Sequence, residues 1–292
     1  APADTPTAEP PQASGTPAAP VTAPPPATAP ATTVPTPHPA AAEPPRTFQL
    51  HHGDAEQQRA LAEQTIVGAP GAVLVVTPRP VLWSTTSPMR GKVGPTHLYD
   101  PAQRAQAGRR LRWSPTHRCE DMDTARRRAA ALLAPVRPRS RLDSALADTA
   151  ETLLRCWLHA AAVSGAPFRQ VHRWASGNSQ GEAVRLLRTR TAAASGAAGA
   201  LESVLTAHPE RRDAAMALVQ RALTAHSRLH VRNSCIGSRP DALALESFVP
   251  EGGTVYIVGD AIEDPRRGDP GTTPFATALL SHVVETGRRM AE

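Results

Sequence analysis

The chain has 292 residues, a formal net charge of +6 and only three cysteines. None of its segments approaches the ~20 consecutive apolar residues of a membrane-spanning helix. The odd number and wide spacing of Cys119, Cys156 and Cys235 exclude a disulfide framework and a C-x-x-C zinc site. We therefore expect free thiols in a reducing, cytoplasmic compartment and no bound metal.

Residues 1–46 are dominated by proline, alanine and threonine. Fifteen of the chain's 31 prolines lie between Pro2 and Pro45. A segment of this composition cannot bury enough apolar surface to offset its conformational entropy, so we predict a disordered linker. Residues 1–45 carry a charge of −3, so residues 46–292 carry +9. A basic body favours a polyanionic partner, although an arginine-rich composition also arises in GC-rich genomes.

The first part of an α/β domain is predicted over residues 47–118. Asp54 is a good N-cap for a helix over Ala55–Ile66. Ala72–Val76 is a short aliphatic run, which is typical of a strand buried on both faces. A second strand is expected at His97–Tyr99, and strand, crossover and strand form the βαβ unit of a parallel sheet.

This arrangement predicts where chemistry would occur. Ligands of such sheets bind beyond the carboxyl ends of the strands, here at Thr77–Pro80 and Asp100. A short strand at Thr47–Leu50 would precede the first helix. Strand, turn and helix is the context in which a phosphate-binding loop lies.

The periodicity becomes helical after Cys119. Apolar residues recur at i, i+3 and i+4 from Leu142 to Ala161, which predicts an amphipathic helix ending at Gly165. Shorter helices follow, and we interpret residues 119–236 as an all-α subdomain inserted into the α/β domain.

The α/β pattern resumes over residues 237–292. Thr254–Val258 reads as a buried strand and Pro274–Met290 as a helix. A further strand would be expected after Glu292, so the sheet is predicted to be incomplete. The sequence begins at Ala1 without an initiator methionine, and we expect it to be the soluble part of something longer.

Several motifs in consistent order carry a family resemblance. They are G-A-P-G-A-V-L-V-V-T from Gly68, G-P-T-H-L-Y-D-P from Gly94, R-W-S-P-T-H-R-C-E-D-M-D-T-A from Arg112 and E-G-G-T-V-Y-I-V-G from Glu251. Together they resemble the TraG/TraD-type coupling proteins of bacterial conjugation, in an actinobacterial version.

The resemblance implies a RecA-like P-loop ATPase fold with an inserted all-α domain. It further implies a homo-hexameric ring at the inner face of the plasma membrane. Such a ring would pass single-stranded DNA and its relaxase to the other components of a type IV secretion system.

The phosphate-binding loop departs from the family pattern G-x-x-x-x-G-K-[ST]. The loop should fall on residues 51–58, which read H-H-G-D-A-E-Q-Q. The first glycine, second glycine, lysine and Ser/Thr of the pattern are replaced by His51, Glu56, Gln57 and Gln58. Carboxylates at Asp54 and Glu56, beside Gly53, would repel triphosphate by roughly 1–4 kcal/mol per close charge pair. We therefore expect neither a catalytic residue nor bound ATP and Mg²⁺ here.

Two other positions could meet a ligand. Asp260 follows the strand Thr254–Val258, but the resemblance places that strand one before the family's acidic strand, which would follow Glu292. Arg79, in T-P-R-P, stands where the family tends to carry lysine and could contact an anion; a salt bridge or a solvated side chain is the alternative. The sole lysine, Lys92, is not followed by a hydroxyl residue.

A run of arginines without acids extends from Ala125 to Leu142 and could neutralise several phosphates of single-stranded DNA. Its members are Arg126, Arg127, Arg128, Arg137, Arg139 and Arg141, with Arg104, Arg109, Arg110 and Arg112 just upstream. The alternative is a solvated helix face, because only 3% of the residues are aromatic and stacking positions are not interleaved.

Three hypotheses follow. The leading one is a coupling-protein homologue or fragment without its own ATPase activity, which acts as a structural or DNA- and relaxase-recruiting component. The second is a DNA-translocating ATPase completed by residues or subunits outside this chain. The third is a structural remnant without function.

Overall fold

The computed structural model describes residues 49–138, 140, 143–260 and 269–291. The predicted linker over residues 1–46 lies outside the described residues. Gln49 and Leu50, the described part of the strand expected at Thr47–Leu50, form no strand. All the helices and strands belong to one compact unit that begins at His51.

The described strands form one parallel sheet. They are β1 (Val73–Thr77), β2 (Thr96–Tyr99) and β3 (Thr254–Val258), in the order β1-β3-β2. Thr254 of β3 is in register with Val73 on one side and with Thr96 on the other. The prediction of three parallel strands is confirmed, and each bound lies within one residue of the expected one.

The position of β1 differs from the prediction. β3 comes from a distant part of the chain and inserts between β1 and β2, so β3 is the central strand and β1 is an edge of the described sheet. All five residues of β3 are buried, whereas Val76 of β1 is 50% exposed. The expectation that Ala72–Val76 is buried on both faces is therefore wrong. An aliphatic run has the same appearance in a central strand and in a half-covered edge strand, so the run could not distinguish them.

The two faces of the sheet carry separate cores, because successive side chains of a strand point to opposite faces. Tyr256 and Val258 pack on one face against α1 (Ala55–Gly68) and α2 (Val81–Arg90). Val255 and Ile257 pack on the other face, in the core that contains α11 (Thr273–Ala291).

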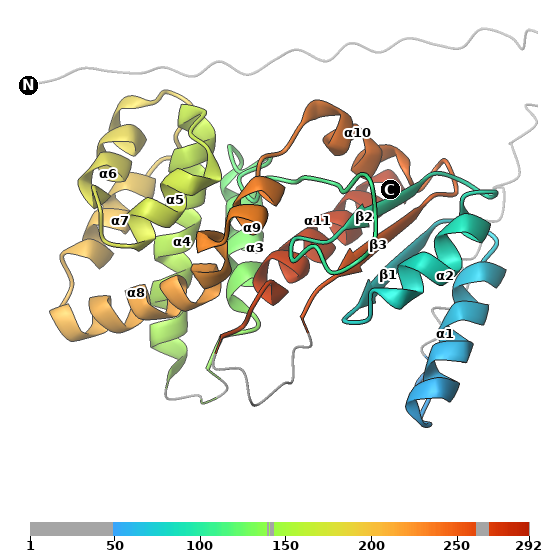
Figure 1. Ribbon diagram of the computed structural model, residues 1–292. Coiled ribbons are helices and arrows are strands. Elements are labelled where there is room, and N and C mark those ends of the chain that lie inside the picture. Colours follow the sequence, from blue (N-terminus) through green and yellow to red (C-terminus); the bar gives the residue numbers. More distant parts are fainter. Residues whose placement is uncertain (1–48, 139, 141–142, 261–268, 292) are drawn as a thin grey trace, which may run out of the picture. The chain divides into compact units, whose positions relative to one another are not determined.

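The other helices follow in sequence between β2 and β3, and most of them form the block seen on the left of Figure 1. Their bounds are α3 (Met122–Leu133), α4 (Ser144–Ser164), α5 (Phe168–Ala175), α6 (Gln180–Thr189), α7 (Ala197–Leu205), α8 (Pro209–Leu223), a 3₁₀ turn (Thr224–Ser227), α9 (Leu229–Ser234) and α10 (Arg239–Ser247).

α4 is the central helix of this block, and it ends at Gly165 in the left-handed conformation as predicted. Leu153, Leu154, Trp157 and Leu158 of α4 are fully buried. α3 packs against both α4 and α11, so the helical block and one face of the sheet share a continuous core. The division at residues 118 and 236 stays a prediction.

Candidate functional site

The N-terminus of α1 occupies the predicted phosphate-loop position and is capped by its own carboxylate. Asp54 Oδ1 accepts hydrogen bonds from the backbone N–H groups of Glu56 (2.9 Å) and Gln57 (2.8 Å). Gln57 Oε1 accepts in return from the Asp54 N–H (3.4 Å), which completes a capping box. Free N–H groups at a helix N-terminus are what binds an anion. Here two of these donors are already bonded to the chain itself.

The amide side chains at the lysine and Ser/Thr positions also fold back on this turn. Gln58 Nε2 donates to the Gly53 carbonyl (3.0 Å). A Cβ atom at Gly53 would lie 2.7 Å from Gln57 Oε1, so the cap requires glycine at this position. Both glutamines therefore hold the turn together.

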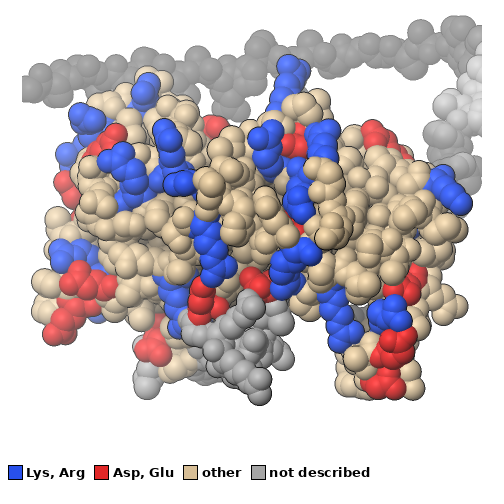
Figure 2. All heavy atoms as spheres, in the orientation of Figure 1, with Lys and Arg blue, Asp and Glu red and all other residues tan. Residues whose placement is uncertain are grey.

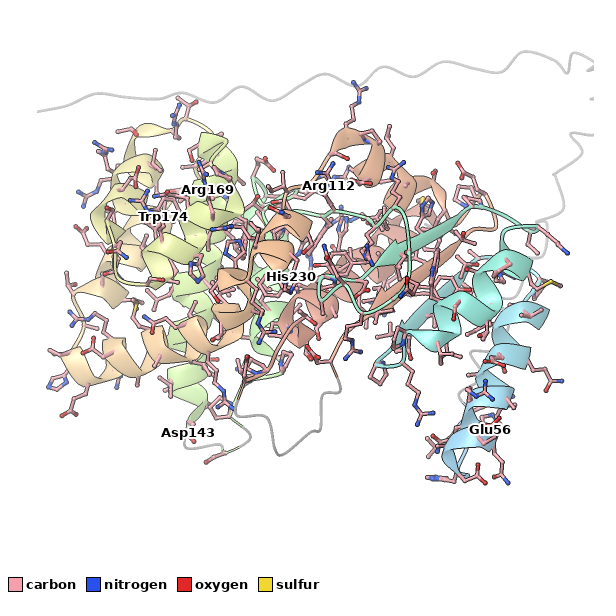
Figure 3. The ribbon with its side chains drawn as sticks, in the orientation of Figure 1. Glu56, Arg112, Asp143, Arg169, Trp174 and His230 are labelled. Carbon is pink, nitrogen blue, oxygen red and sulfur yellow. The ribbon has the colours of Figure 1, made fainter. Side chains whose placement is uncertain are left out.

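Glu56 lies on the exposed side of the same turn, at the free end of α1 (Figure 3). Its carboxylate forms an ion pair with Arg59, and this hydrogen bond and charge lower the pKa of Glu56. A negative charge therefore stays at the loop at neutral pH.

Arg79 is brought to the predicted loop by the fold. It follows the carboxyl end of β1, and its Nη1 donates to the carbonyl of Ala55 (3.1 Å), 24 residues earlier. Lys92 follows α2, which runs back across the sheet, and so lies toward the amino ends of the strands. Arg79 rather than Lys92 is thus the cation beside the loop.

A groove of about 540 Å³ lies between α1 and β1, next to this loop. Its lining is mainly apolar and includes Leu61, Ile66 and Val76, with His51 and Gln58 at the loop. No Lys or Arg belongs to the described lining. The groove therefore lacks the cations that would neutralise a phosphate.

Asp260, at the carboxyl end of β3, is held in a network of its own. Its Oδ2 accepts from the N–H (2.9 Å) and the Oγ1 (3.0 Å) of Thr272, and its Oδ1 from Arg104 Nη1 (3.3 Å). Arg104 Nη2 also donates to the carbonyls of Pro78 and Gly259. The described residues contain no group of three His, Cys, Asp or Glu side chains placed to hold a metal ion.

Asp100, at the end of β2, is buried and braces the turn that follows it. Its Oδ2 accepts from the Ala105 N–H (2.7 Å) and lies 3.7 Å from Arg110 Nε. The arrangement at the ends of β2 and β3 is thus a set of internal polar contacts.

The predicted arginine cluster does not form one open surface. Arg126 lies 3.6 Å from Asp123, and Arg127 lies 2.7 Å from Glu285 of α11. Arg137 pairs with Asp148 (2.9 Å) and Glu151 (3.3 Å) of α4. Their acidic partners come from outside the acid-free run. Arg139 and Arg141 lie outside the described residues.

Arg128 is a core residue rather than a surface one. Its guanidinium lies 4.3 Å from the centre of the Trp113 ring and donates to the Pro115 carbonyl (3.2 Å). Burial lowers the pKa of Arg128 to about 10. This correction to the predicted cluster follows from α3, whose inward face carries Arg128 together with Ala125 and Leu132.

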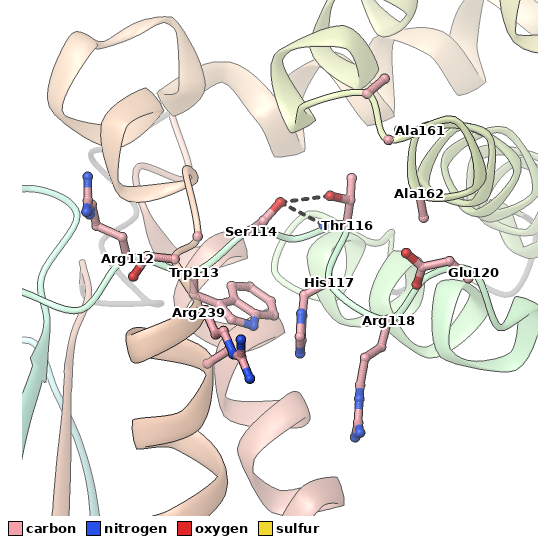
Figure 4. Close-up of a pocket in the computed structure, with 15 residues that line it drawn as sticks. Arg112, Trp113, Ser114, Thr116, His117, Arg118, Glu120, Ala161, Ala162 and Arg239 are labelled. Carbon is pink, nitrogen blue, oxygen red and sulfur yellow. Dashed lines mark hydrogen bonds between the residues drawn. The ribbon is translucent and has the colours of Figure 1, made fainter.

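Sequence reasoning missed a pocket of about 450 Å³ between the segment 112–120, the end of α4 and the start of α10 (Figure 4). Arg118, Arg239 and His117 line it, with the hydroxyls of Ser114 and Thr116. The motif R-W-S-P-T-H-R-C-E-D was noted only for its resemblance. A histidine flanked by arginine and hydroxyl residues was the available signal, but the contribution of α10 could not be read from it.

No protein-family model matches the chain, and the search of curated proteins found no match. Two solved structures do match. The first is the unbound monoclinic form of the bacterial conjugative coupling protein TrwBdeltaN70, with a TM-score of 0.52 and 18% identity over 78% of this chain and 47% of that one. The second is the plasmid coupling protein TrwB in complex with ADP and Mg²⁺, with a TM-score of 0.54 and 18% identity over 80% and 49%.

The fold resembles that of TrwB. The predicted α/β fold class of the coupling proteins is thereby confirmed, and this chain spans about half the length of those structures. Among the described residues, no helix is both long enough and apolar enough to cross a membrane. The actinobacterial lineage stays a prediction.

Proposed function

We propose that this chain is a coupling-protein homologue, or a piece of one, that serves conjugative DNA transfer without hydrolysing ATP itself. The observation that carries the proposal is the Asp54 carboxylate, bonded to the N–H groups of Glu56 and Gln57 in a chain with a TrwB-like fold.

The energetic argument rests on three losses at the same turn. A phosphate bound at α1 would have to displace the Asp54 carboxylate and then lie beside it, at a cost of roughly 1–4 kcal/mol per close charge pair. Gln57 supplies no charge to the β- and γ-phosphates, and Gln58 supplies no hydroxyl to Mg²⁺. Arg79 is the nearby cation, and its guanidinium already donates to Ala55.

The proposed role is structural, or it recruits DNA and relaxase to type IV secretion components at the inner face of the membrane, within a homo-oligomeric ring. Arg126, Arg127 and Arg137 are the described members of the predicted arginine cluster that reach the surface. Their ion pairs would have to exchange for phosphate contacts.

The nucleotide test is a titration with a fluorescent ATP analogue in the presence of Mg²⁺. We expect no saturable binding at micromolar concentrations. Binding that is lost in Gln57→Ala or Gln58→Ala, but kept in Gln64→Ala on the exposed part of α1, would instead support an ATPase completed by residues or subunits outside this chain.

The DNA test compares single-stranded DNA affinity at two salt concentrations. A surface that neutralises phosphates gives affinity that falls steeply with salt. A variant with glutamine at all six arginines of the predicted cluster should bind more weakly and with a smaller salt dependence. Unchanged binding would remove that cluster from the proposal, and an absence of any DNA binding would favour a structural role.

A further inference from the structure

The pocket beneath α10 differs from the N-terminus of α1 in having polar donors without partners. Trp113 is 2% exposed, yet its Nε1–H has no hydrogen-bond partner. The Nε2 atom of His117 is likewise buried without a partner. Burying such a group unsatisfied costs about 1–3 kcal/mol, so each calls for an explanation.

Two arginines stand beside these donors. Figure 4 shows the side chains of Arg239, His117 and Arg118 extending to the same side of the pocket. Within the described residues, Arg239 forms no ion pair or side-chain hydrogen bond. Arg118 meets its carboxylate partner, Glu246, only at 3.8 Å. Their positive charge is therefore available to a ligand.

The backbone at Arg118 supports a specific placement of this side chain. Its φ of 60° lies in the left-handed region, which costs a residue other than glycine about 1–3 kcal/mol and is most common at functional sites. The opposite wall is formed by Ser114 and Thr116, whose hydroxyl oxygens lie 2.8 Å apart. Glu120 is the acidic residue of the described lining.

We propose that this pocket binds a phosphate group, held by Arg118 and Arg239, with His117, Trp113 and the Ser114–Thr116 hydroxyl pair as further donors. Planar guanidinium groups bind phosphate oxygens in bidentate fashion, and a tetrahedral oxyanion accepts from several directions at once. The volume of about 450 Å³ lies within the range of small-molecule sites and exceeds what a carboxylate alone would fill.

The same chemistry is offered by a small phosphate compound and by the backbone of a nucleic acid. The blue side chains in Figure 2 gather across the middle of the face shown, in the region of α9 and α10. A neighbouring cavity of about 570 Å³ is lined by Arg169 and Arg232, and it shares Ser114 and Gly237 with the phosphate pocket. A longer phosphate-bearing ligand could therefore extend from one into the other.

The test is isothermal titration of the full chain with pyrophosphate, with ADP and with an oligothymidylate of about 20 nucleotides. We expect at least one of these to bind, and the double variant Arg118→Gln/Arg239→Gln to bind it at least about tenfold more weakly, because two charge-assisted contacts are lost. The control with the same change of net charge is Arg185→Gln/Arg190→Gln, on exposed positions of α6 and its C-cap.

Binding of pyrophosphate or ADP identifies a small-molecule site, and binding of the oligonucleotide alone identifies a contact with nucleic-acid backbone. Glu120→Gln provides a test of opposite sign, because removing the carboxylate should tighten binding about twofold or more. The proposal is overturned if none of the three probes binds, or if the double variant binds as well as its control. Either result leaves the proposed function in place, since the loop at Asp54 is not involved.

Discussion

The sheet with α1 and the pocket beneath α10 both hold donors at which an anion could bind, and they differ in whether the chain itself satisfies them. At the turn before α1, Asp54 takes two backbone N–H groups. At the edges of the sheet, the buried Arg90 and the part-buried Arg104 donate to backbone carbonyls. In the pocket, Arg239, His117 Nε2 and Trp113 Nε1 lack such acceptors. An abundance of arginine in the sequence therefore does not measure capacity for anions.

The largest effect is expected at Arg90, which is fully buried. It donates to Thr254 Oγ1 (2.8 Å) and to the carbonyls of Ala69 (2.6 Å) and Gly252 (3.2 Å), so it joins the loops at the amino edge of the sheet. Arg90→Leu should lower the free energy of unfolding by about 3–5 kcal/mol, because several acceptors lose their partner together. Urea denaturation measures this loss.

The matched control is Arg79→Leu, which removes one exposed hydrogen bond and should change stability by less than about 1 kcal/mol. Similar losses in the two variants would contradict the distinction between satisfied internal donors and surface ones.

The wall of the pocket should respond to pH. Burial, and then the charge of Arg128, lower the pKa of His282 to about 3. His282 stacks on Trp113 (ring centres 5.6 Å apart) and meets His117 edge-on. Since the folded pKa is depressed below the ordinary value near 6.5, the neutral form is favoured in the folded state. This stability is present above pH 6.5 and is lost as the pH falls toward 3.

Between pH 6.5 and 5, this one group should account for a loss of about 1–2 kcal/mol. His282→Gln should remove that part of the pH dependence, as measured by unfolding at both pH values. His208→Gln, at the N-cap of α8, serves as a control and should leave the pH dependence as in the parent.

A smaller effect is expected at the α1 cap. Asp54→Ala should lower the free energy of unfolding by about 1 kcal/mol, because two N–H groups lose their acceptor. Asp54→Asn keeps a good capping oxygen and removes the charge, so its stability should stay close to that of the parent. Equal stability of all three proteins in thermal unfolding would mean that the cap does not form in solution.

The smallest effect is expected from the paired surface arginines. Replacing Arg126, Arg127 and Arg137 by glutamine should change stability by less than about 1 kcal/mol each, as exposed ion pairs usually do. A larger loss in urea denaturation would show that these pairs, and not only Arg128, belong to the structural framework of the helical block.

Local sequence pattern alone was sufficient for much of this protein. The aliphatic runs predicted the three strands to within a residue, Asp54 predicted the start of α1, and Gly165 predicted the end of α4, because caps and periodicity act over one or two turns. The motifs of the sheet predicted the fold class shared with TrwB.

Only the tertiary structure decided what the polar residues do. It placed β3 between β1 and β2, brought Arg79 to Ala55, buried Arg128 against Trp113, and set Arg118 and Arg239 at one pocket. These pairings join residues far apart in the chain. The free energy of a charged group depends on the partners and solvent around it, and neither is encoded in its neighbours along the sequence.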